Sequence, residues 1–593
     1  MTPEPDFGRF GPDLPPPPAA PATRGTRIVL LGDFAGRSHR GELRTSDEIA
    51  RLKPIRLDVD ASDRVIAGFA TTLSLPVAAD GGCVEVHARS LDDLHPDSLY
   101  ELPVFGELAN LRARLAHPKT ARAASDEVRA WIVKDEGASP EAATPRARRA
   151  RGNSLRVDAR LRDFACPRAQ SQPAAAPAST VEDLLRATIA PHLADAPEPD
   201  APALMAAIDR ALSATMRALL HHPDLQCLEA AWRSLDFVAR RVRTHARLQV
   251  VIHDISAEEF AADLAGAERL EETGLYRLLV EEAALDAQQG LPSAIVADYR
   301  FEMTPPHAEL LGRVAQIAAH ANAPFIAAVG ADALAGRDED LHPMIVNAWQ
   351  KLRALPAAAW LALAAPRFLL RAPYGERGEP VDCFEFEEFD PRVGLKALLW
   401  GNPAMLVAAL LAGHVDAAGR LEAPGRLLSL PEMPWFVFAD ADGDATTLPC
   451  TERLLTERQA AQAQGRGIAP VLSIKGRPEV RLGGFRSMAG GALAGPWAAP
   501  AARPAAPTAS AATCASEPPS GAPSRTRGED TESVDAAPTE AGDDAVTDGN
   551  GTAGGNDELD ALLARLDAGS ADASASHSDS GLDPELEALL KDL

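Results

Sequence analysis

Residues 205–255 read MAAIDRALSATMRALLHHPDLQCLEAAWRSLDFVARRVRTHARLQVVIHDI. Apolar side chains recur at helical spacing in Met205–Leu220 and again in Leu225–Val242, which predicts two amphipathic helices. Pro223 separates them, and a proline in the first helical turn sacrifices no hydrogen bond. The β-branched run Leu248–Ile255 then predicts a buried strand. Two helices that feed a strand form the packing unit around which the remaining chain is organised.

Trp232 lies on the second of these helices and shares its apolar face with Leu228 and Leu235. We expect the indole to be buried in the core between the two helices. An aromatic side chain in such a core contributes about 3–5 kcal/mol relative to alanine.

Helix-like and strand-like segments alternate through the rest of the central region. Glu258–Gly290 and Ala308–Ala321 predict helices, whereas Ile295–Ala297 and Pro324–Val329 predict buried strands. This alternation predicts an α/β body with a mixed sheet and flanking helices. In Phe384–Phe389 phenylalanines interleave with glutamates. We interpret that segment as a half-solvated strand with its carboxylates in water, rather than as a metal or acid–base site.

The N-terminal part of the chain also predicts strands. Thr26–Leu31 is an apolar, β-branched run that ends at the turn-forming GDFAGR, and the glycine patterns of phosphate-binding loops are absent there. Ile55–Val59, Thr71–Leu75 and Cys83–Ala88 predict further strands, and the leucines of Ser90–Leu115 share one helical face.

Composition divides the chain into five parts. We predict a disordered Pro-rich arm at residues 1–25, with Phe7 and Phe10 exposed, and a basic, Pro/Ala-rich linker at residues 135–180. Folded domains are expected at residues 26–134 and 181–497. Residues 498–593 contain nineteen acidic and five basic residues, which is typical of a disordered tail.

Two short leucine-rich islands interrupt the acidic tail, DELDALLARLD from Asp557 and DPELEALLKDL from Asp583. Each places its leucines on one helical face, and the pattern is consistent either with helices that dock on a partner or with nascent helices that have none. The docking leucines would be Leu559, Leu562, Leu563, Leu566, Leu586, Leu589, Leu590 and Leu593.

Charge and motif content exclude several classes of function. A net charge of −26 argues against a general nucleic-acid binder, and no run of about 18 apolar residues is present to span a membrane. The six cysteines form no C-x-x-C pair, which argues against zinc and fits reduced thiols in a cytoplasm. The acidic ADADGDA segment lacks the twelfth-position glutamate of a calcium loop and predicts a turn. We therefore expect no enzyme, no cofactor and no metal.

The string HHPDLQCLEAAWRSLDFV closely resembles the start of the large subunit of the type VI secretion contractile sheath. Similar strings follow in the family's order, namely IVADYRFEM, VAQIAAHANAPFIAAV, WQKLRA, APRFLLRAPYGERGEPVDCFEFEE, WGNPA and LPCTE. The resemblance covers about residues 181–497. It implies structural roles for Arg367 and Phe368 in the APRFLLR string, and Thr451 is the expected N-cap of a following helix.

A second resemblance, to the small subunit of the same sheath, covers about residues 27–115 and rests on RIVLLGDFAGR and the block SLDDLHPD to LPVFGELANLRARL. In this family the two subunits are usually separate chains, so the resemblance implies a small-plus-large fusion. Because the family joins neighbouring protomers by strand exchange, we expect exposed strand edges at Arg27–Leu31, which contains Val29 and Leu30, and at Val471–Ile474.

The resemblances imply a cytoplasmic structural protomer that self-associates into rings or helical tubes around an inner tube protein and drives its ejection by contraction. Baseplate components and a Clp-type unfoldase are further expected partners. An accessory or regulatory protein that docks on the secretion machine without forming the sheath is the first alternative. A nucleotide-dependent α/β protein is a distant one.

Overall fold

The computed structural model describes residues 5–12, 14, 25–76, 83–135, 189, 201–285, 290–334, 341–391, 393–419, 421, 428–439 and 445–498. The chain divides into two units, Met1–Ala499 and Pro500–Leu593, and every described residue belongs to the first. The predicted tail leucines, residues 440–444 of the ADADGDA turn and nearly all of the predicted linker lie outside the described residues.

A nine-stranded sheet forms the centre of the first unit, with the strand order β11-β15-β14-β8-β7-β6-β1-β5-β2. Neighbouring strands run parallel from β14 to β5, and antiparallel pairs close both ends. The expected α/β architecture with a mixed sheet is confirmed. The strands are β1 (Thr26–Gly32), β2 (Ile55–Leu57), β5 (Leu248–Asp254), β6 (Ala294–Phe301), β7 (Phe325–Val329), β8 (Leu361–Ala365), β11 (Leu428–Pro431), β14 (Ile468–Ser473) and β15 (Glu479–Leu482).

Strand β1 lies inside this sheet, not at its edge. Val29 is opposite Val251 of β5 on one side and opposite Ile295 of β6 on the other. Strand β14 likewise lies between β8 and β15. The prediction that Arg27–Leu31 offers a free edge for strand exchange is therefore wrong, because β1 already has two hydrogen-bonded neighbours. In the described part of β14, Ile468–Pro470 pair with β8 and Val471–Ser473 pair with β15, so the edge expected at Val471–Ile474 stays a prediction.

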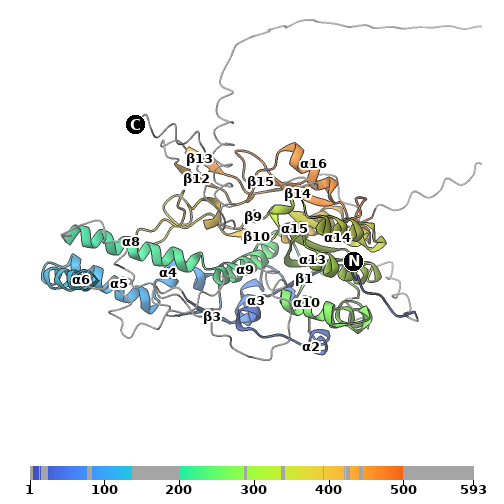
Figure 1. Cartoon of the computed structure of the whole chain (residues 1–593), viewed down its shortest axis with the longest axis horizontal. Coiled ribbons are helices and arrows are strands. Elements are labelled where there is room, and N and C mark those ends of the chain that lie inside the picture. The colour runs from blue at the N-terminus through green and yellow to red at the C-terminus, as the bar shows by residue number, and fades with distance from the viewer. Residues whose placement is uncertain are drawn as a thin grey trace, which may run out of the picture. The chain divides into compact units, whose positions relative to one another are not determined.

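Helices cover both faces of the sheet (Figure 1). Alternate residues of β1 enter different cores: Val29 and Leu31 pack with α10, α11 and α13, whereas Ile28 and Leu30 pack with the second half of α9 and with α15. The helices involved are α9 (Pro223–Arg241), α10 (Ala257–Gly266), α11 (Gly274–Tyr276), α13 (Pro305–His320), α14 (Pro343–Ala354) and α15 (Pro403–Ala418). Because side chains alternate across a strand, burial on both faces explains the continuous apolar run Ile28–Leu31.

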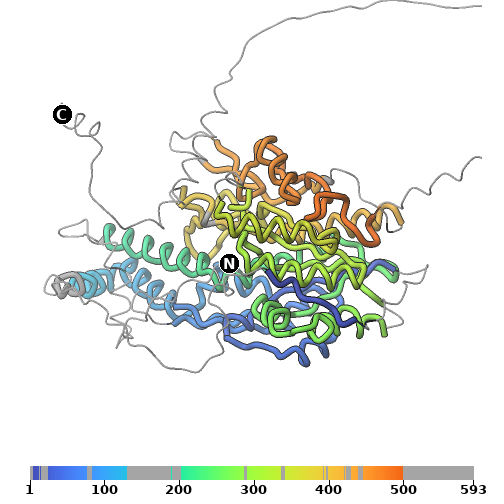
Figure 2. Tube along the Cα trace, turned by 45° about the vertical axis from the view of Figure 1, so that its right-hand side comes forward, coloured from blue at the N-terminus to red at the C-terminus, as the bar shows by residue number. Residues whose placement is uncertain are grey.

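A helical lobe extends from one end of the sheet (Figure 2). Its core joins α5, α6, α8 and the first half of α9 to the hairpin β3-β4. The remaining elements are α1 (Arg37–Arg40), α2 (Ser46–Ala50), α3 (Ser62–Phe69), β3 (Thr71–Leu75), β4 (Val84–Ala88), α4 (Pro96–Leu99), α5 (Pro103–Ala116), α6 (Ala121–Asp135), α8 (Ala201–Leu220), α12 (Ala283–Leu285), β9 (Phe368–Leu369), β10 (Trp400–Gly401), β12 (Phe436–Ala439), β13 (Ala445–Leu448) and α16 (Glu457–Gly465).

The single helix expected over Glu258–Gly290 is broken. After α10 the chain forms the 3-10 turn η4 (Leu270–Glu272), then α11, and then a π-helical segment, η5 (Arg277–Glu282). The Asp263 carboxylate accepts hydrogen bonds from the N–H groups of Gly274 and Leu275, both at 2.8 Å. This side chain fixes the turn between the helices, an interaction that apolar periodicity alone does not reveal.

The N-terminal arm also differs from expectation. Residues 5–12 lie on the surface helix α13, and both Phe7 and Phe10 pack against the core cluster beneath them. The prediction that these two rings are exposed is wrong, because composition gave no indication of the complementary surface on residues 269–320.

Candidate functional site

The loop that follows β1 is where an α/β fold with parallel strands would bind a nucleotide. Here the N–H groups of Phe34 and Ala35 donate to Asp254 Oδ1 at 2.8 and 3.1 Å. Those of Arg37 and Ser38 donate to the Asp33 carboxylate, both at 2.9 Å. The amides that a phosphate would need are thus bonded to carboxylates of the chain itself, so the geometry gives no support to a nucleotide site.

Arg37 forms the centre of a buried ion-pair cluster at this loop. Its guanidinium pairs with the Asp254 carboxylate and, at 2.7 Å, with Glu259 Oε2. Burial disfavours the charged guanidinium, but the hydrogen bond to Glu259 and the charge of Asp254 outweigh it and raise the pKa of Arg37. Glu259 also accepts from the N–H of Ser256 in the capping box that begins α10. The cluster therefore ties the loop after β1 to the end of β5 and the start of α10.

A second buried cluster surrounds Arg371, which follows β9. Its guanidinium donates to Glu229 Oε1 at 2.7 Å and to Glu388 Oε2 and Oε1 at 2.6 and 3.0 Å. Arg233 also donates to Glu229, at 2.8 Å, and to the Tyr374 hydroxyl at 2.9 Å. Two arginines and two glutamates balance in charge, and together they hold the segment 371–388 against α9.

Glu388 corrects the interpretation of Phe384–Phe389 as a half-solvated strand. The segment has no regular secondary structure, and the Glu388 side chain is 1% exposed. Burial alone would raise the pKa of Glu388, but Arg371 and hydrogen bonds to the ionised carboxylate lower it to about 2. Glu385 and Glu387 are exposed, as the alternation of phenylalanine and glutamate predicts, whereas Glu388 is buried.

The sequence contains one indication of the Arg371 cluster, a glutamate within an apolar helix face. Glu229 lies one turn after Leu225 and beside Leu228, on the apolar face of α9, and is fully buried. A charged residue within a buried stripe needs a buried partner of opposite charge. Arg371 lies far away in sequence, so the signal indicates that a partner exists without saying which residue it is.

Trp232 is fully buried in the core of the helical lobe, as predicted. Its indole Nε1 donates to the carbonyl oxygen of Phe34 at 2.8 Å. The side chain therefore connects α9 with the loop after β1 in addition to packing against α8.

We expect Trp232→Ala to lower the free energy of unfolding by about 3–5 kcal/mol, because it creates a cavity and leaves a buried carbonyl without its donor. Urea unfolding followed by circular dichroism measures the change. Trp435→Ala is the matched control, since Trp435 is 41% exposed, and should change stability by about 0.5 kcal/mol or less. Equal effects of the two substitutions would contradict a core role for Trp232.

The residues expected from the APRFLLR and LPCTE strings meet in space. The Arg367 N–H and Nε donate to the Glu452 carboxylate at 2.9 and 2.7 Å. Phe368 is fully buried and forms an isolated antiparallel bridge with Thr451.

Thr451 is not a helix cap, which corrects the expected role. Its hydroxyl donates to the carbonyl oxygen of Arg453 at 2.9 Å. Helix α16 begins later, with Thr456 as N-cap in a capping box with Gln459. Thr451 and Thr456 are each followed by a glutamate. Only Thr456 has a glutamine three residues later, Gln459, which completes a capping box.

His253 is a buried titratable group on β5, opposite Leu31 of β1. Burial and the charge of Arg27 lower its pKa to about 4. A histidine in an unfolded chain titrates near about 6.5. The neutral ring thus stabilises the fold fully above about pH 6.5, and this contribution is lost as the pH falls toward 4.

Between pH 7 and pH 4.5 the wild type should lose about 2–3 kcal/mol of stability through His253. The His253→Leu protein should not show this part of the loss. Urea unfolding at both pH values measures the difference. His87→Leu is the control, because the His87 side chain is 68% exposed. An identical pH dependence in wild type and His253→Leu would show that His253 does not resist protonation.

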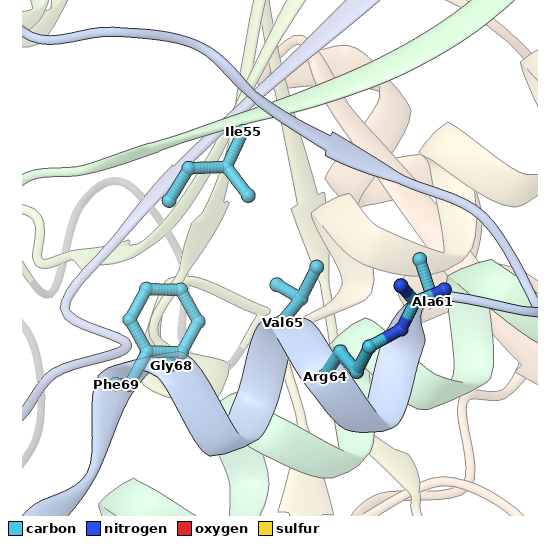
Figure 3. A pocket seen from close by; sticks show the side chains of 6 residues that line it. All are labelled: Ile55, Ala61, Arg64, Val65, Gly68 and Phe69. Carbon is cyan, nitrogen blue, oxygen red and sulfur yellow. The ribbon is translucent and has the colours of Figure 1, made fainter.

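An apolar hollow of about 330 Å³ lies between the edge strand β2 and helix α3 (Figure 3). It is lined by Ile55, Ala61, Arg64, Val65, Gly68 and Phe69. One arginine among apolar side chains offers no nucleophile and no acid–base pair. Within the described ranges, no group of three or more histidine, cysteine, aspartate or glutamate residues is arranged to hold a metal ion. No described helix is both long enough and apolar enough to cross a membrane.

Comparison with known proteins relates the chain to type VI secretion sheath proteins. Residues 202–489 match the family model described as EvpB/VC_A0108, tail sheath N-terminal domain. Over 291 residues the chain is 28% identical to the type VI secretion system sheath protein TssC1 of Pseudomonas aeruginosa, an alignment that covers 46% of this chain and 58% of that protein. The predicted resemblance to the type VI secretion sheath is confirmed for residues 202–489. The resemblance of residues 27–115 to the small subunit stays a prediction, because the family match begins at residue 202.

Proposed function

We propose that the chain is a structural protomer of a contractile sheath, because residues 202–489 match a tail sheath domain and the chain is similar to a type VI secretion sheath protein. In this proposal it associates with copies of itself around an inner tube protein in the cytoplasm and drives ejection of the tube by contraction. Contacts with baseplate components and a Clp-type unfoldase belong to the same proposal. It performs no catalysis, and its work comes from the repacking of contacts between protomers.

The observation that carries this proposal is the position of β1. The strand comes from the region that resembles the small subunit, and it lies between β5 and β6 of the region that resembles the large subunit. The Arg37 cluster and the Trp232 hydrogen bond join the same two regions. A single chain thus contains both halves of one sheet, which supports a fused small-plus-large protomer.

Electron microscopy of the purified full chain tests the function. A sheath protomer should form tubes or rings, alone or when mixed with the inner tube protein of the same secretion system. A particle that stays monomeric under both conditions, yet binds a preformed sheath, would support the accessory role instead.

Cutting the chain between its two sheath-like regions should leave the two fragments associated, because two parallel ladders hold β1 and a buried ion pair of Arg37 holds the loop after it. A protease site inserted among residues 136–188 allows this cut in the purified protein. Gel filtration should show both fragments in one peak near the elution volume of the intact chain. Separate peaks without denaturant would contradict the fused-protomer proposal.

A further inference from the structure

The N-terminal end of the chain lies near helix α13 (Figure 1). A dense set of polar contacts holds the arm to α13 and to the turn η4. Arg313 pairs with the Asp6 carboxylate at 2.6 Å and also donates to the Asp6 carbonyl oxygen at 3.1 Å. Gln316 Nε2 donates to the carbonyl oxygens of Phe7 and Gly8 at 2.6 and 2.9 Å. The backbone of the arm is therefore recognised by side chains of α13, as a bound peptide would be.

The other end of the arm is fixed by the turn η4 and its neighbours. The Leu270 N–H donates to the carbonyl oxygen of Arg9 at 3.1 Å. The Gly11 N–H donates to Glu271 Oε1 at 2.9 Å. Polar groups thus hold the arm on both sides of its second phenylalanine.

The two phenylalanines of the arm pack at two separate positions on this surface, which we call the Phe7 seat (at Gly312) and the Phe10 seat (between Tyr276 and His320). Phe7 lies against Gly312, where a Cβ atom would come within 2.0 Å of the Phe7 ring. The three atoms nearest to that Cβ position all belong to Phe7, so the missing side chain makes room for this ring. Phe10 packs between Tyr276 and His320, with ring centroids 5.6 and 5.1 Å apart. The spacing Phe-Gly-x-Phe matches these two seats.

The binding surface is complete without the rest of the N-terminal region. In the described chain, the hydrogen bonds, ion pairs and ring contacts of residues 5–11 to other segments fall on residues 269–320. Ten residues, 15–24, connect the arm to Gly25 and β1. Ten residues reach at most about 35 Å, and exchange of an identical segment between protomers costs little because every contact is retained.

We propose that the surface around Gly312 is a peptide-binding site for the sequence Asp-Phe-Gly-Arg-Phe-Gly, and that in an assembly the arm of a second copy of this chain fills it. The ligand is an extended peptide with an acidic residue before the first phenylalanine. The exchange rests on the proposed function only because an assembly brings two copies close together. The binding site itself does not depend on sheath formation.

Two full-length variants separate binding within one chain from binding between chains. Phe7→Ala/Phe10→Ala weakens the arm and leaves the site open. Gly312→Leu fills the Phe7 seat and leaves the arm free, and leucine is a better helix former than glycine. Gly413→Leu is the matched control, because Gly413 is an exposed glycine of α15 with nothing within 4 Å of its Cβ position.

Fluorescence anisotropy measures binding of a labelled peptide of residues 4–14 to the Phe7→Ala/Phe10→Ala protein. We expect saturable binding that weakens at least about tenfold when Gly312→Leu is added and is unchanged when Gly413→Leu is added. Absence of peptide binding overturns the proposal. If circular dichroism shows that Gly312→Leu is misfolded, Arg313→Glu replaces it, since that change reverses the charge that pairs with Asp6.

Sedimentation of the two variants mixed in equal amounts tests the exchange. The Gly312→Leu chain offers an arm and the Phe7→Ala/Phe10→Ala chain offers a site, so the mixture should contain a complex larger than either variant forms alone. Combining all three substitutions in both chains should abolish that complex. Peptide binding without a mixed complex would restrict the arm to its own chain and overturn the exchange. Failure of tube formation with an intact mixed complex would count against the sheath function alone.

Discussion

Arg371→Met should lower the free energy of unfolding by about 3–5 kcal/mol at pH 7, because it leaves two buried carboxylates without their main positive partner. Glu229 and Glu388 are 0% and 1% exposed and both pair with the Arg371 guanidinium. With a total stability of about 5–15 kcal/mol for a typical domain, a loss of this size approaches global unfolding. Urea unfolding followed by circular dichroism measures it.

The pH dependence of this variant distinguishes charge from lost packing. The pKa of Glu388, lowered to about 2 in the folded protein, lies below the value of about 4.3 for an unfolded chain. The stabilisation is therefore present above that value and is lost as the pH falls toward 2. In Arg371→Met the two carboxylates can protonate at a higher pH, so the stability deficit should shrink between pH 7 and about pH 4. A deficit that does not change with pH would contradict the ion-pair explanation.

An exposed ion pair provides the control. Arg240 pairs with Asp236 at 2.7 Å on the same helix, and its side chain is 70% exposed. Arg240→Met should cost about 1 kcal/mol or less, because water solvates the carboxylate that remains. The comparison separates removal of an arginine on a helix surface from removal of one in the interior.

Local sequence patterns predicted the elements well. Strands β1 and β3 were expected at Thr26–Leu31 and Thr71–Leu75, and both lie within one residue of those bounds. Helices α8 and α9 follow from the apolar spacing on either side of Pro223. These features depend on periodicity and on helix capping, which are properties of neighbouring residues.

The place of β1 in the sheet could not be predicted from such patterns. Its partners β5 and β6 begin more than 200 residues later in the chain. A run buried on both faces is consistent with a central parallel strand, but family analogy favoured an exchanged edge, and that interpretation is wrong. The pattern of burial was the better guide, because an exposed edge strand is seldom apolar at every position.

The buried charges escaped prediction for a related reason. Arg37 and Arg371 pair with residues more than 100 positions away, such as Asp254 and Glu229. A sequence shows which charged residues interrupt an apolar stripe, but only the tertiary fold shows which opposite charge meets them. The docked arm illustrates the same limit. Phe7 packs where Gly312 has no side chain, and a sequence does not show which ring would occupy that space.

Val29→Pro should prevent stable folding of the chain, with a cost of at least about 3 kcal/mol. Val29 is 2% exposed and lies in the middle of β1, between Val251 and Ile295 on the two neighbouring strands. Proline donates no backbone hydrogen bond, and it is tolerated within sheets only at edges, at strand starts or at bulges. The substitution also removes a β-branched side chain from the core. Circular dichroism and gel filtration should show unfolded or aggregated protein.

Val59→Pro is the matched control for this prediction. Val59 is 56% exposed and occupies the second position of a turn in which the Ala61 N–H donates to the Asp58 carbonyl oxygen at 3.3 Å. Proline is favoured at that position of a turn, so Val59→Pro should leave the midpoint of thermal unfolding nearly unchanged. Hydrogen exchange of the wild type provides an independent measurement, in which the β1 amides should be among the slowest to exchange. A folded Val29→Pro protein that fails only to assemble would restore the edge-strand hypothesis, because a strand at the rim can lose one donor without loss of the sheet.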